Sequence, residues 1–275
     1  MNAEARARTL MADWRRYLAD TFDPGAPGVL LHRGSSEFNS APIGVVAVRL
    51  EDPSTNVKTG DMVQVYIMPL GISPLRAVHS GYDEAVCGAC WMRPLLNGGC
   101  YVNVAWGAGR VHRCLEAGVY PEQWEPAWFR GALVRVGAWG DPAGAPLEMW
   151  QRLLSEVHGF TAYTHAWRGR DVSEWGWCMA SVDSVEEQRE AAALGWRTFR
   201  AGDEAGIEGE RLCLAESHGI SCAVCLGCGS RSMRRGGRVS QRCHYRIPRH
   251  GPRKAWGGGQ GLLFDKLPLK EGESA

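Results

Sequence analysis

The sequence predicts an α/β protein whose core is a parallel sheet of βαβ units carrying Cys-rich metal-binding loops. After residue 130, short apolar runs alternate with amphipathic helical patterns, and this alternation is typical of parallel sheets. The 275 residues are enough to bury a substantial core in one large or two small domains. The sheet could close into a small or partial TIM-type barrel, with an open sheet as the alternative.

The N-terminal part is predicted to contain one helix and two strands. Residues 2–22 repeat apolar side chains at helical spacing, with arginines on the remaining faces that we expect to be solvated. The apolar face holds Leu10, Trp14, Tyr17 and Leu18. Residues 45–48 and 62–68 have the apolar, β-branched composition of strands.

Five strands and two helices are expected after residue 130. The strands are residues 132–138, 160–166, 175–181, 196–201 and 211–215. The first helix begins near Pro146 and is expected to stop at Gly159. The second begins with Ser184-Val-Glu-Glu187, a capping box in which hydroxyl and carboxylate satisfy backbone N–H groups, and ends before Gly195.

Charge is distributed unevenly along the chain. The net charge is +1, but the stretch from Ser217 to Phe264 contains nine Lys or Arg and no Asp or Glu. Such a segment on an otherwise acidic body predicts a polyanionic partner. We therefore expect an N-terminal helix (1–22), an α/β body with both Cys clusters (43–229), and a basic, Arg/Gly-rich, partly disordered C-terminal segment (230–275).

The basic segment is the expected nucleic-acid-binding surface, with DNA as the expected partner. Arginines make forked contacts with phosphates and need not read the base sequence. The candidate residues are Arg231, Arg234, Arg235, Arg238, Arg242, Arg246, Arg249, Arg253 and Lys254. A segment that only keeps the protein in solution is the alternative.

The chain has no apolar run long enough to cross a bilayer, and its first residues lack the apolar segment of a signal peptide. We expect no membrane partner and a cytoplasmic location. Ten cysteines in a reducing compartment favour thiolate ligands over a disulfide framework.

Four cysteines near the end of the body form the strongest motif. Cys213, Cys222, Cys225 and Cys228 follow one another with eight, two and two residues between them. A two-residue gap lets the backbone bring both sulfurs to one centre, so this quartet predicts one metal ion or one iron–sulfur cluster. Zinc and iron–sulfur are equal alternatives, with Cys243 and His244 as weaker candidates for the same site.

A second cluster, the trio, precedes the quartet and consists of Cys87, Cys90 and Cys100. It lacks a fourth ligand, which His79, His112, a distant cysteine or a member of the quartet could supply. Three protein ligands with an open fourth position are typical of catalytic metal sites.

Asp141, His165 and Asp183 are the candidate catalytic residues. Each lies at, or just beyond, the carboxyl end of an expected strand. Parallel α/β folds gather active-site groups at that edge, and two carboxylates with a histidine can act as nucleophile, base and orienting group. The alternative for the aspartates is turn and helix-cap chemistry, because Asp141 precedes a proline and Asp183 precedes the capping serine.

The order of these motifs resembles a family of uncharacterised actinobacteriophage proteins named after gene product eighty-eight of a mycobacteriophage. The resemblance covers residues 58–229 and lies in the trio, Gly140-Asp141, residues 163–167, residues 181–183 and the quartet. It implies a phage or prophage origin, and hence the cytoplasm of a bacterial host, and it brings no settled activity.

A fainter resemblance is to the guanine transglycosylase-like enzymes with which some phages insert 7-deazaguanines into DNA. It implies a TIM-type barrel, a structural zinc, and Asp141 and Asp183 as nucleophile and base. The zinc pattern of those enzymes, C-x-C-x2-C with a distant histidine, does not occur in this chain.

Together these patterns predict a metal-binding protein that acts on nucleic acid. It could be an enzyme that modifies DNA bases through Asp141 and Asp183. A non-catalytic, zinc-stabilised nucleic-acid-binding protein is the first alternative, and an iron–sulfur enzyme is the second.

Overall fold

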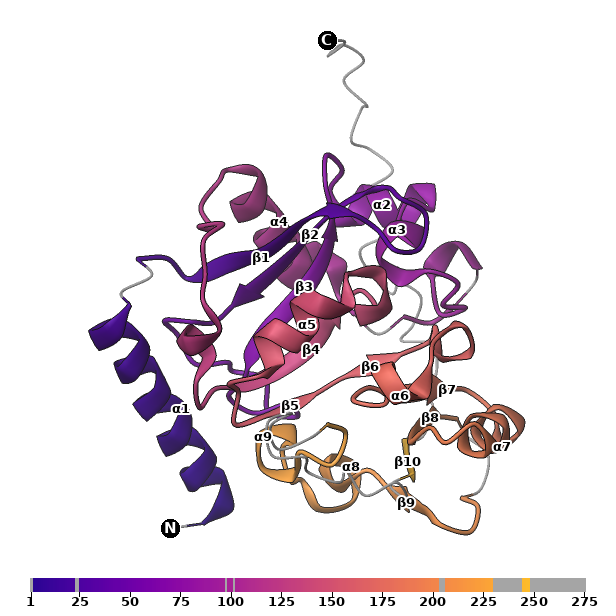
Figure 1. The fold of residues 1–275 in the computed structure, drawn as a ribbon. Helices are drawn as coiled ribbons and strands as arrows, with labels where there is room; N and C mark the ends of the chain where they lie inside the picture. Colours follow the sequence, from indigo (N-terminus) through magenta and orange to yellow (C-terminus); the bar gives the residue numbers. More distant parts are fainter. Residues whose placement is uncertain are drawn as a thin grey trace, which may run out of the picture.

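Two five-stranded sheets form the centre of the protein (Figure 1). The computed structural model describes residues 2–22, 25–96, 98–100, 102–202, 206–229 and 244–247. The strands are β1 (Gly28–Ser35), β2 (Pro42–Val48), β3 (Val63–Pro69), β4 (Leu133–Trp139), β5 (Gly159–Thr161), β6 (Tyr163–Thr164), β7 (Met179–Val182), β8 (Thr198–Ala201), β9 (Glu210–Leu212) and β10 (His244–Ile247). Their orders are β1-β2-β3-β4-β5 and β6-β7-β8-β10-β9. Only Ala162 separates β5 from β6, so one stretch of chain joins the sheets.

Helices and short helical turns connect the strands. The α-helices are α1 (Ala3–Thr21), α2 (Pro74–Ser80), α3 (Glu84–Cys87), α4 (Gly109–Glu116), α5 (Leu147–Leu154), α6 (Val172–Trp175), α7 (Val185–Ala193), α8 (Leu214–His218) and α9 (Cys222–Cys225). The other turns are the 3-10 helices η1 (Pro94–Leu96), η3 (Pro126–Phe129), η4 (Pro142–Gly144) and η5 (Trp167–Gly169), and the π-helix η2 (Val104–Ala108). Within the described residues, every helix is too short or too polar to span a membrane.

The parallel sheet predicted from the sequence is confirmed from β3 onward. β3 pairs in parallel with β4 and β4 with β5, and all described pairings of the second sheet are parallel. The first sheet also has an antiparallel part, formed by β1, β2 and β3. Among the described strands, β1 and β5 are the end strands of the first sheet, and β6 and β9 are those of the second. The fold is therefore a mixed, parallel-rich α/β sheet, and a TIM-type barrel is not shown.

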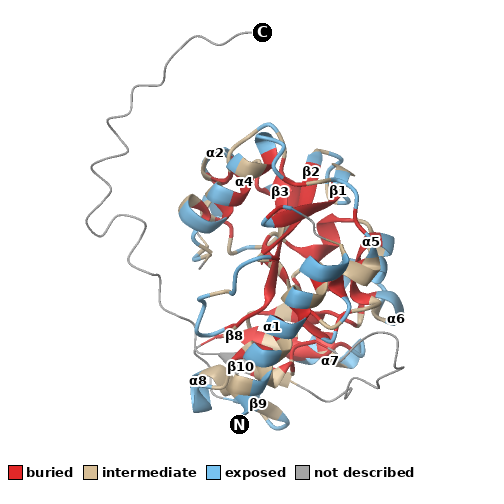
Figure 2. Cartoon of the chain, turned by 90° about the vertical axis from the view of Figure 1, so that its left-hand side faces the viewer, coloured by how far each residue is buried: buried red, intermediate tan, exposed pale blue. Residues whose placement is uncertain are grey.

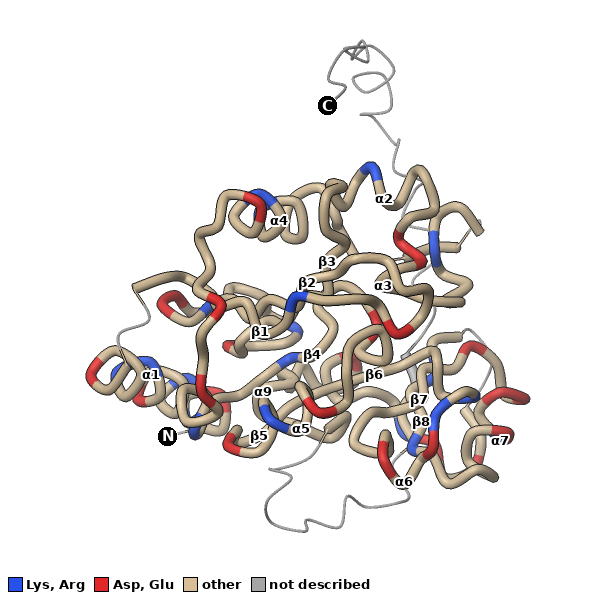
Figure 3. Tube along the Cα trace, turned by 45° about the horizontal axis from the view of Figure 1, so that its top comes forward, with Lys and Arg blue, Asp and Glu red and all other residues tan. Residues whose placement is uncertain are grey.

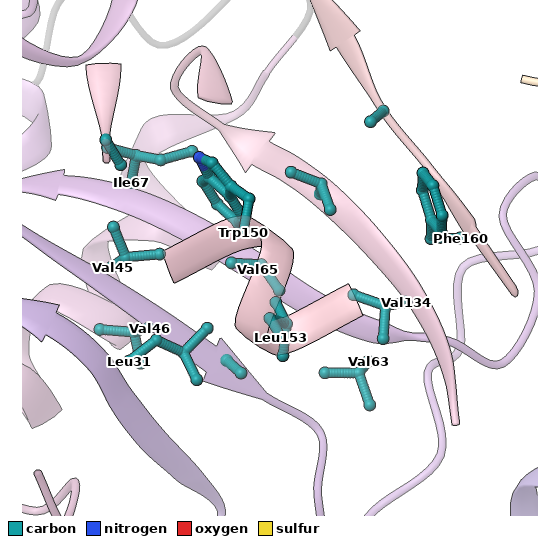
Figure 4. Close-up of a cluster of buried hydrophobic side chains, with 14 of the residues drawn as sticks. Leu31, Val45, Val46, Val63, Val65, Ile67, Val134, Trp150, Leu153 and Phe160 are labelled. Atoms are coloured by element: carbon teal, nitrogen blue, oxygen red, sulfur yellow. The ribbon is translucent and has the colours of Figure 1, made fainter. Parts of the chain in front are cut away.

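Strands β2 and β3 are apolar on both faces because helices cover both faces. Figure 4 shows Trp150 and Leu153 of α5 packed against Val65 and neighbouring strand residues. On the opposite face, a Cβ built at Gly44 would lie 3.3 Å from Leu115 of α4. Figure 2 shows the same layering, with buried strands inside and the exposed face of α1 outside.

The helix predicted over residues 2–22 is confirmed as α1. Its fully buried residues are Met11, Trp14 and Leu18, while Leu10 and Tyr17 are only half-buried. The expectation that its arginines are solvated is wrong for Arg15. The Arg15 guanidinium makes two contacts of 2.7 Å with the Asp61 carboxylate, and both side chains are largely shielded. This ion pair fixes α1 to the segment before β3.

Two predicted boundaries are wrong by four residues or more. The helix expected to stop at Gly159 ends at Leu154, and Gly159 begins β5 instead. A Cβ at Gly159 would lie 2.7 Å from Leu226 Cδ1, so glycine is needed there for close packing and not for a helix end. The strand expected over 175–181 begins only at Met179, because α6 and a turn occupy the residues before it.

The capping box at the start of α7 is confirmed. The Glu187 N–H donates to Ser184 Oγ at 3.1 Å, and the Glu187 carboxylate accepts the Asp183 N–H at 2.9 Å. Gly195 follows the last turn with a φ of 89° and ends the helix in the left-handed conformation. The box therefore also fixes the backbone at Asp183.

Strand β10 comes from the segment that the sequence analysis set apart as a basic C-terminal region. It lies between β8 and β9 and is parallel to both. Arg200 of β8 and Glu210 of β9, the strands on either side of it, form an ion pair at 2.6 Å with both side chains fully shielded from solvent. The second sheet thus includes residues well beyond Gly229.

Candidate functional site

Asp141, His165 and Asp183 meet at the carboxyl edge of the parallel strands. They follow the ends of β4, β6 and β7. The Asp141 carboxylate accepts the His165 backbone N–H at 2.6 Å, and His165 Nε2 lies 3.8 Å from Asp183 Oδ2. The structure therefore brings the three residues together, while their catalytic role stays a prediction.

Asp141 is buried, and both of its carboxylate oxygens are engaged. Oδ1 accepts hydrogen bonds from Thr164 Oγ1 at 2.7 Å and from the Ala143 N–H at 3.0 Å, and Oδ2 accepts the His165 N–H. Burial raises the pKa of the Asp141 carboxyl, and the His165 ring and these hydrogen bonds oppose that shift. Asp141 is thus suited to hold the loops after β4 and β6 in place, and less suited to attack a substrate.

His165 and Asp183 are the more accessible members of this group. Their side chains keep 24% and 10% of their accessible surface. Trp91, which is 37% exposed, donates its indole N–H to Asp183 Oδ2. His165 Nε2 has no hydrogen-bond partner within the described chain. Nε2 itself is shielded from solvent, while other atoms of the ring remain exposed. An imidazole nitrogen close to a carboxylate can exchange a proton with a molecule that reaches it.

The trio lines a cavity of about 30 Å³. The loop that carries these cysteines is held by Arg93, whose guanidinium donates to Asp83 at 2.9 Å and to the carbonyls of Gly81 and Gly88 at 2.7 and 3.1 Å. Arg93 belongs to no recognisable motif, so sequence reasoning missed it. Its role depends on carbonyls that only the fold brings together.

The trio lies next to Asp141, His165 and Asp183, which are called the edge residues here. The Asp141 N–H donates to the carbonyl of Val86, the residue before Cys87, at 2.6 Å. Trp91, which binds Asp183, directly follows Cys90. Burial, above all, together with the negative charges of Cys100, Asp141 and Asp183, raises the pKa of the Cys90 thiol to about 12. Trio and edge residues therefore share one electrostatic environment.

The quartet lines a second cavity, of about 40 Å³. Its loop is bound to the segment before β3, because the Cys222 N–H donates to the Lys58 carbonyl at 3.0 Å and the Ala223 N–H donates to the Thr59 carbonyl at 2.9 Å. Burial also raises the pKa of the Cys222 and Cys228 thiols. Without a cation, these thiols are held in the protonated form.

Two further contacts fix the quartet loop, and sequence reasoning missed both. The buried Arg197 guanidinium donates to the carbonyls of Gly176, Trp177, Gly227 and Gly229. On the other side, the Glu4 carboxylate of α1 accepts the N–H and the hydroxyl of Ser221, both at 2.9 Å. The loop is therefore held between the sheet and the N-terminal helix.

The two cysteine clusters lie at opposite ends of the parallel strands. The quartet contacts the residues before β3 and the first residue of β6, Tyr163, whereas the trio lies beside the loop after β4. Their cavities share no lining residue, so the alternative that the quartet supplies the fourth ligand of the trio is wrong. Neither His79 nor His112 lines the trio cavity.

The cysteine clusters suit a metal ion by their chemistry. In the part of the chain that the structure describes, no three His, Cys, Asp or Glu side chains are arranged to hold an ion. Thiolates are nevertheless preferred ligands of zinc, and the sulfurs of each cluster would have to converge to about 2.3 Å from it. Cavities of about 30 and 40 Å³ suit a single ion better than an organic cofactor. Metal binding stays a prediction.

The residues predicted to bind nucleic acid lie outside the described residues, apart from Arg246, of which only the backbone in β10 is described. The others are Arg231, Arg234, Arg235, Arg238, Arg242, Arg249, Arg253 and Lys254. Cys243 is outside as well. His244 lies in β10, where its Nδ1 is 2.8 Å from Thr198 Oγ1.

Comparison with known proteins yields no relative of this chain: no protein-family model matches it, and no curated protein or solved structure is significantly similar. Function is therefore inferred from the site itself.

Proposed function

We propose that the protein is a metal-binding enzyme of phage type that acts on nucleic acid at the carboxyl edge of its parallel strands. One observation carries the proposal: Asp141, His165 and Asp183, which follow β4, β6 and β7 of the two sheets, meet there, and His165 and Asp183 form a histidine–carboxylate pair. A pair of this kind is the usual machinery of proton transfer. The thiols beside it would hold the metal.

The three residues have different roles in this proposal. Asp183 and His165 would act on the reacting molecule, with the Asp183 carboxylate as base or nucleophile and His165 Nε2, 3.8 Å from it, as the second proton-transfer group. Asp141 is a positioning residue, because its oxygens already bind Thr164, Ala143 and the His165 backbone. The fainter resemblance to base-exchanging enzymes supports modification of a DNA base as the reaction.

Nucleic acid is the favoured substrate because of charge. In the view of Figure 3, basic and acidic residues are interspersed over the described body, and the basic Arg168 is paired with Glu187 and Glu190 of α7. The acid-free, arginine-rich stretch between Ser217 and Phe264 would therefore supply most of the phosphate contacts.

The test is Asp183→Asn, which keeps an oxygen for the Trp91 N–H but removes the charge. Wild-type protein and variant are produced in bacteria, and the nucleosides of the host DNA and RNA are measured by mass spectrometry. We expect a new or altered nucleoside with the wild type and a loss of at least about 100-fold with the variant. Asp13→Asn, at an exposed ion pair on α1, is the matched control and should leave the product unchanged.

Two outcomes would contradict the proposal. If Asp183→Asn still produced the full amount of altered nucleoside, the Asp183 carboxylate would have no role in the reaction. Salt-sensitive binding of nucleic acid by wild type and variant alike, with no altered nucleoside, would favour the non-catalytic, zinc-stabilised binding protein.

A further inference from the structure

We propose that the two cysteine clusters hold two separate metal ions with different duties. The quartet would hold a closed, four-thiolate ion that fixes the fold. The trio would hold an ion bound by three thiolates, with its fourth position open to water or to the reacting molecule. This inference rests on the metal binding of the proposed function, and it does not depend on nucleic acid being the substrate.

The separation of the clusters excludes one shared ion. The quartet loop binds the backbone of Lys58 and Thr59 before β3, whereas the Val86 carbonyl beside the trio binds Asp141 after β4. The clusters therefore lie at the amino end of β3 and at the carboxyl end of β4, which pairs with it in parallel. Each has its own small cavity.

The quartet has the features of a structural site. All four thiols line one cavity, so an ion there would have its coordination completed by the protein. The loop is fixed from two directions, by Arg197 on the sheet side and by Glu4 of α1 on the other. An ion at this place would connect the N-terminal helix to the start of the sheet.

The trio has the features of an open site. Its cavity offers three thiols, and no fourth cysteine or histidine lines it among the described residues. Asp83 also lines the cavity, but its carboxylate is paired with Arg93 in a buried ion pair at 2.9 Å. The fourth ligand of an ion would therefore come from outside the protein, as water or as part of the reacting molecule.

Trp91 connects the trio to the proposed catalytic pair, although neither His165 nor Asp183 lines the trio cavity. Trp91, the residue after Cys90, donates its indole N–H to Asp183, and His165 Nε2 lies 3.8 Å from the same carboxylate. An ion at the trio could thus polarise a molecule that His165 and Asp183 also contact. At the other end of the strands, no histidine and no carboxylate of the described residues lines the quartet cavity.

The experiment replaces the native metal by cobalt(II), whose absorption reports its ligands. Metal content and spectra are measured for the wild type and for Cys100→Ser and Cys225→Ser, with Cys114→Ser, on α4 outside both clusters, as the control. We expect two ions in the wild type and the control, and one in each cluster variant. Added imidazole should shift the spectrum of the wild type and of Cys225→Ser, but not that of Cys100→Ser.

The melting temperature separates the two duties. Cys225→Ser should lose more than about 5 °C, and Cys100→Ser less than that. If Cys225→Ser does not fold, the metal content and the imidazole response of the wild type and of Cys100→Ser are sufficient to test the inference. One ion per chain, an imidazole response retained in Cys100→Ser, or a brown protein with iron and sulfide would overturn the inference. If the protein bound two ions but produced no altered nucleoside, this inference would be supported and the proposed reaction would be refuted.

Discussion

Asp141 shows how the chemistry of a single side chain depends on its neighbours. Its place at the carboxyl edge follows from the sequence, because it comes directly after an apolar strand. Its role does not follow from the sequence, because the two groups that donate hydrogen bonds to its carboxylate, the Thr164 hydroxyl and the His165 N–H, lie more than twenty residues further along the chain. A carboxylate with three donors around it holds the neighbouring loops in place. From the sequence, a role in the turn and a role in the active site were both plausible, because Asp141 precedes a proline at the end of a strand.

The substitution Asp141→Asn tests this anchoring role. The amide can still accept from Thr164 and Ala143, but its NH2 group then faces the His165 N–H and leaves that donor without an acceptor. We expect a loss of about 1–3 kcal/mol in the free energy of unfolding, measured by urea denaturation. Asp13→Asn, at an exposed position, should change it by less than about 0.5 kcal/mol. Equal stability of Asp141→Asn and wild type would show that the carboxylate is not an anchor.

At the scale of the elements, local signals were predictable and distant pairings were not. The capping box of α7 is confirmed because hydroxyl and carboxylate act within four residues. Strand β1 was missed although its partner β2 is the next strand along the chain, because its apolar run is short. Distance in the sequence explains Arg15, whose partner Asp61 is 46 residues away. The trio and the quartet were visible as motifs, but their placement at opposite ends depends on strand order.

The cap of α7 should matter for stability and for Asp183. Ser184→Ala removes the acceptor of the Glu187 N–H, and we expect a loss of about 1 kcal/mol in the free energy of unfolding. Ser80→Ala, which removes an exposed hydroxyl at the end of α2, is the control, with an effect below about 0.5 kcal/mol. Thermal denaturation followed by circular dichroism measures both. Indistinguishable curves would mean that tertiary packing alone holds α7.

At the scale of the whole molecule, the partly or fully buried thiols of the trio and the quartet connect stability to pH. The folded state raises the pKa of the Cys90 thiol from 9.0 to about 12, and burial raises the pKa of Cys87, Cys100, Cys222 and Cys228 as well. A group whose pKa is higher in the folded state stabilises it below the unfolded pKa, and this stability is lost as the pH rises.

Metal-free protein should therefore become less stable from about pH 8 to pH 10, because the unfolded chain releases its thiol protons first. An ion bound by thiolates reverses the sign, since protons compete with it, so its stabilising effect should grow as the pH rises. Melting temperatures with and without a chelator measure both trends. Parallel curves over this range would mean that no ion binds the thiols.

The position of β10 has a consequence for how the chain is made. Its four residues follow β9 by more than thirty positions, yet they lie inside the sheet, and the described pairing of β9 is with β10 alone. Until these four residues have been synthesised, β8 and β9 present open edges where β10 pairs in the folded protein. The described part of the second sheet is thus completed only when residue 247 emerges, and until then the newly made chain carries unpaired strand edges of the kind that favour aggregation.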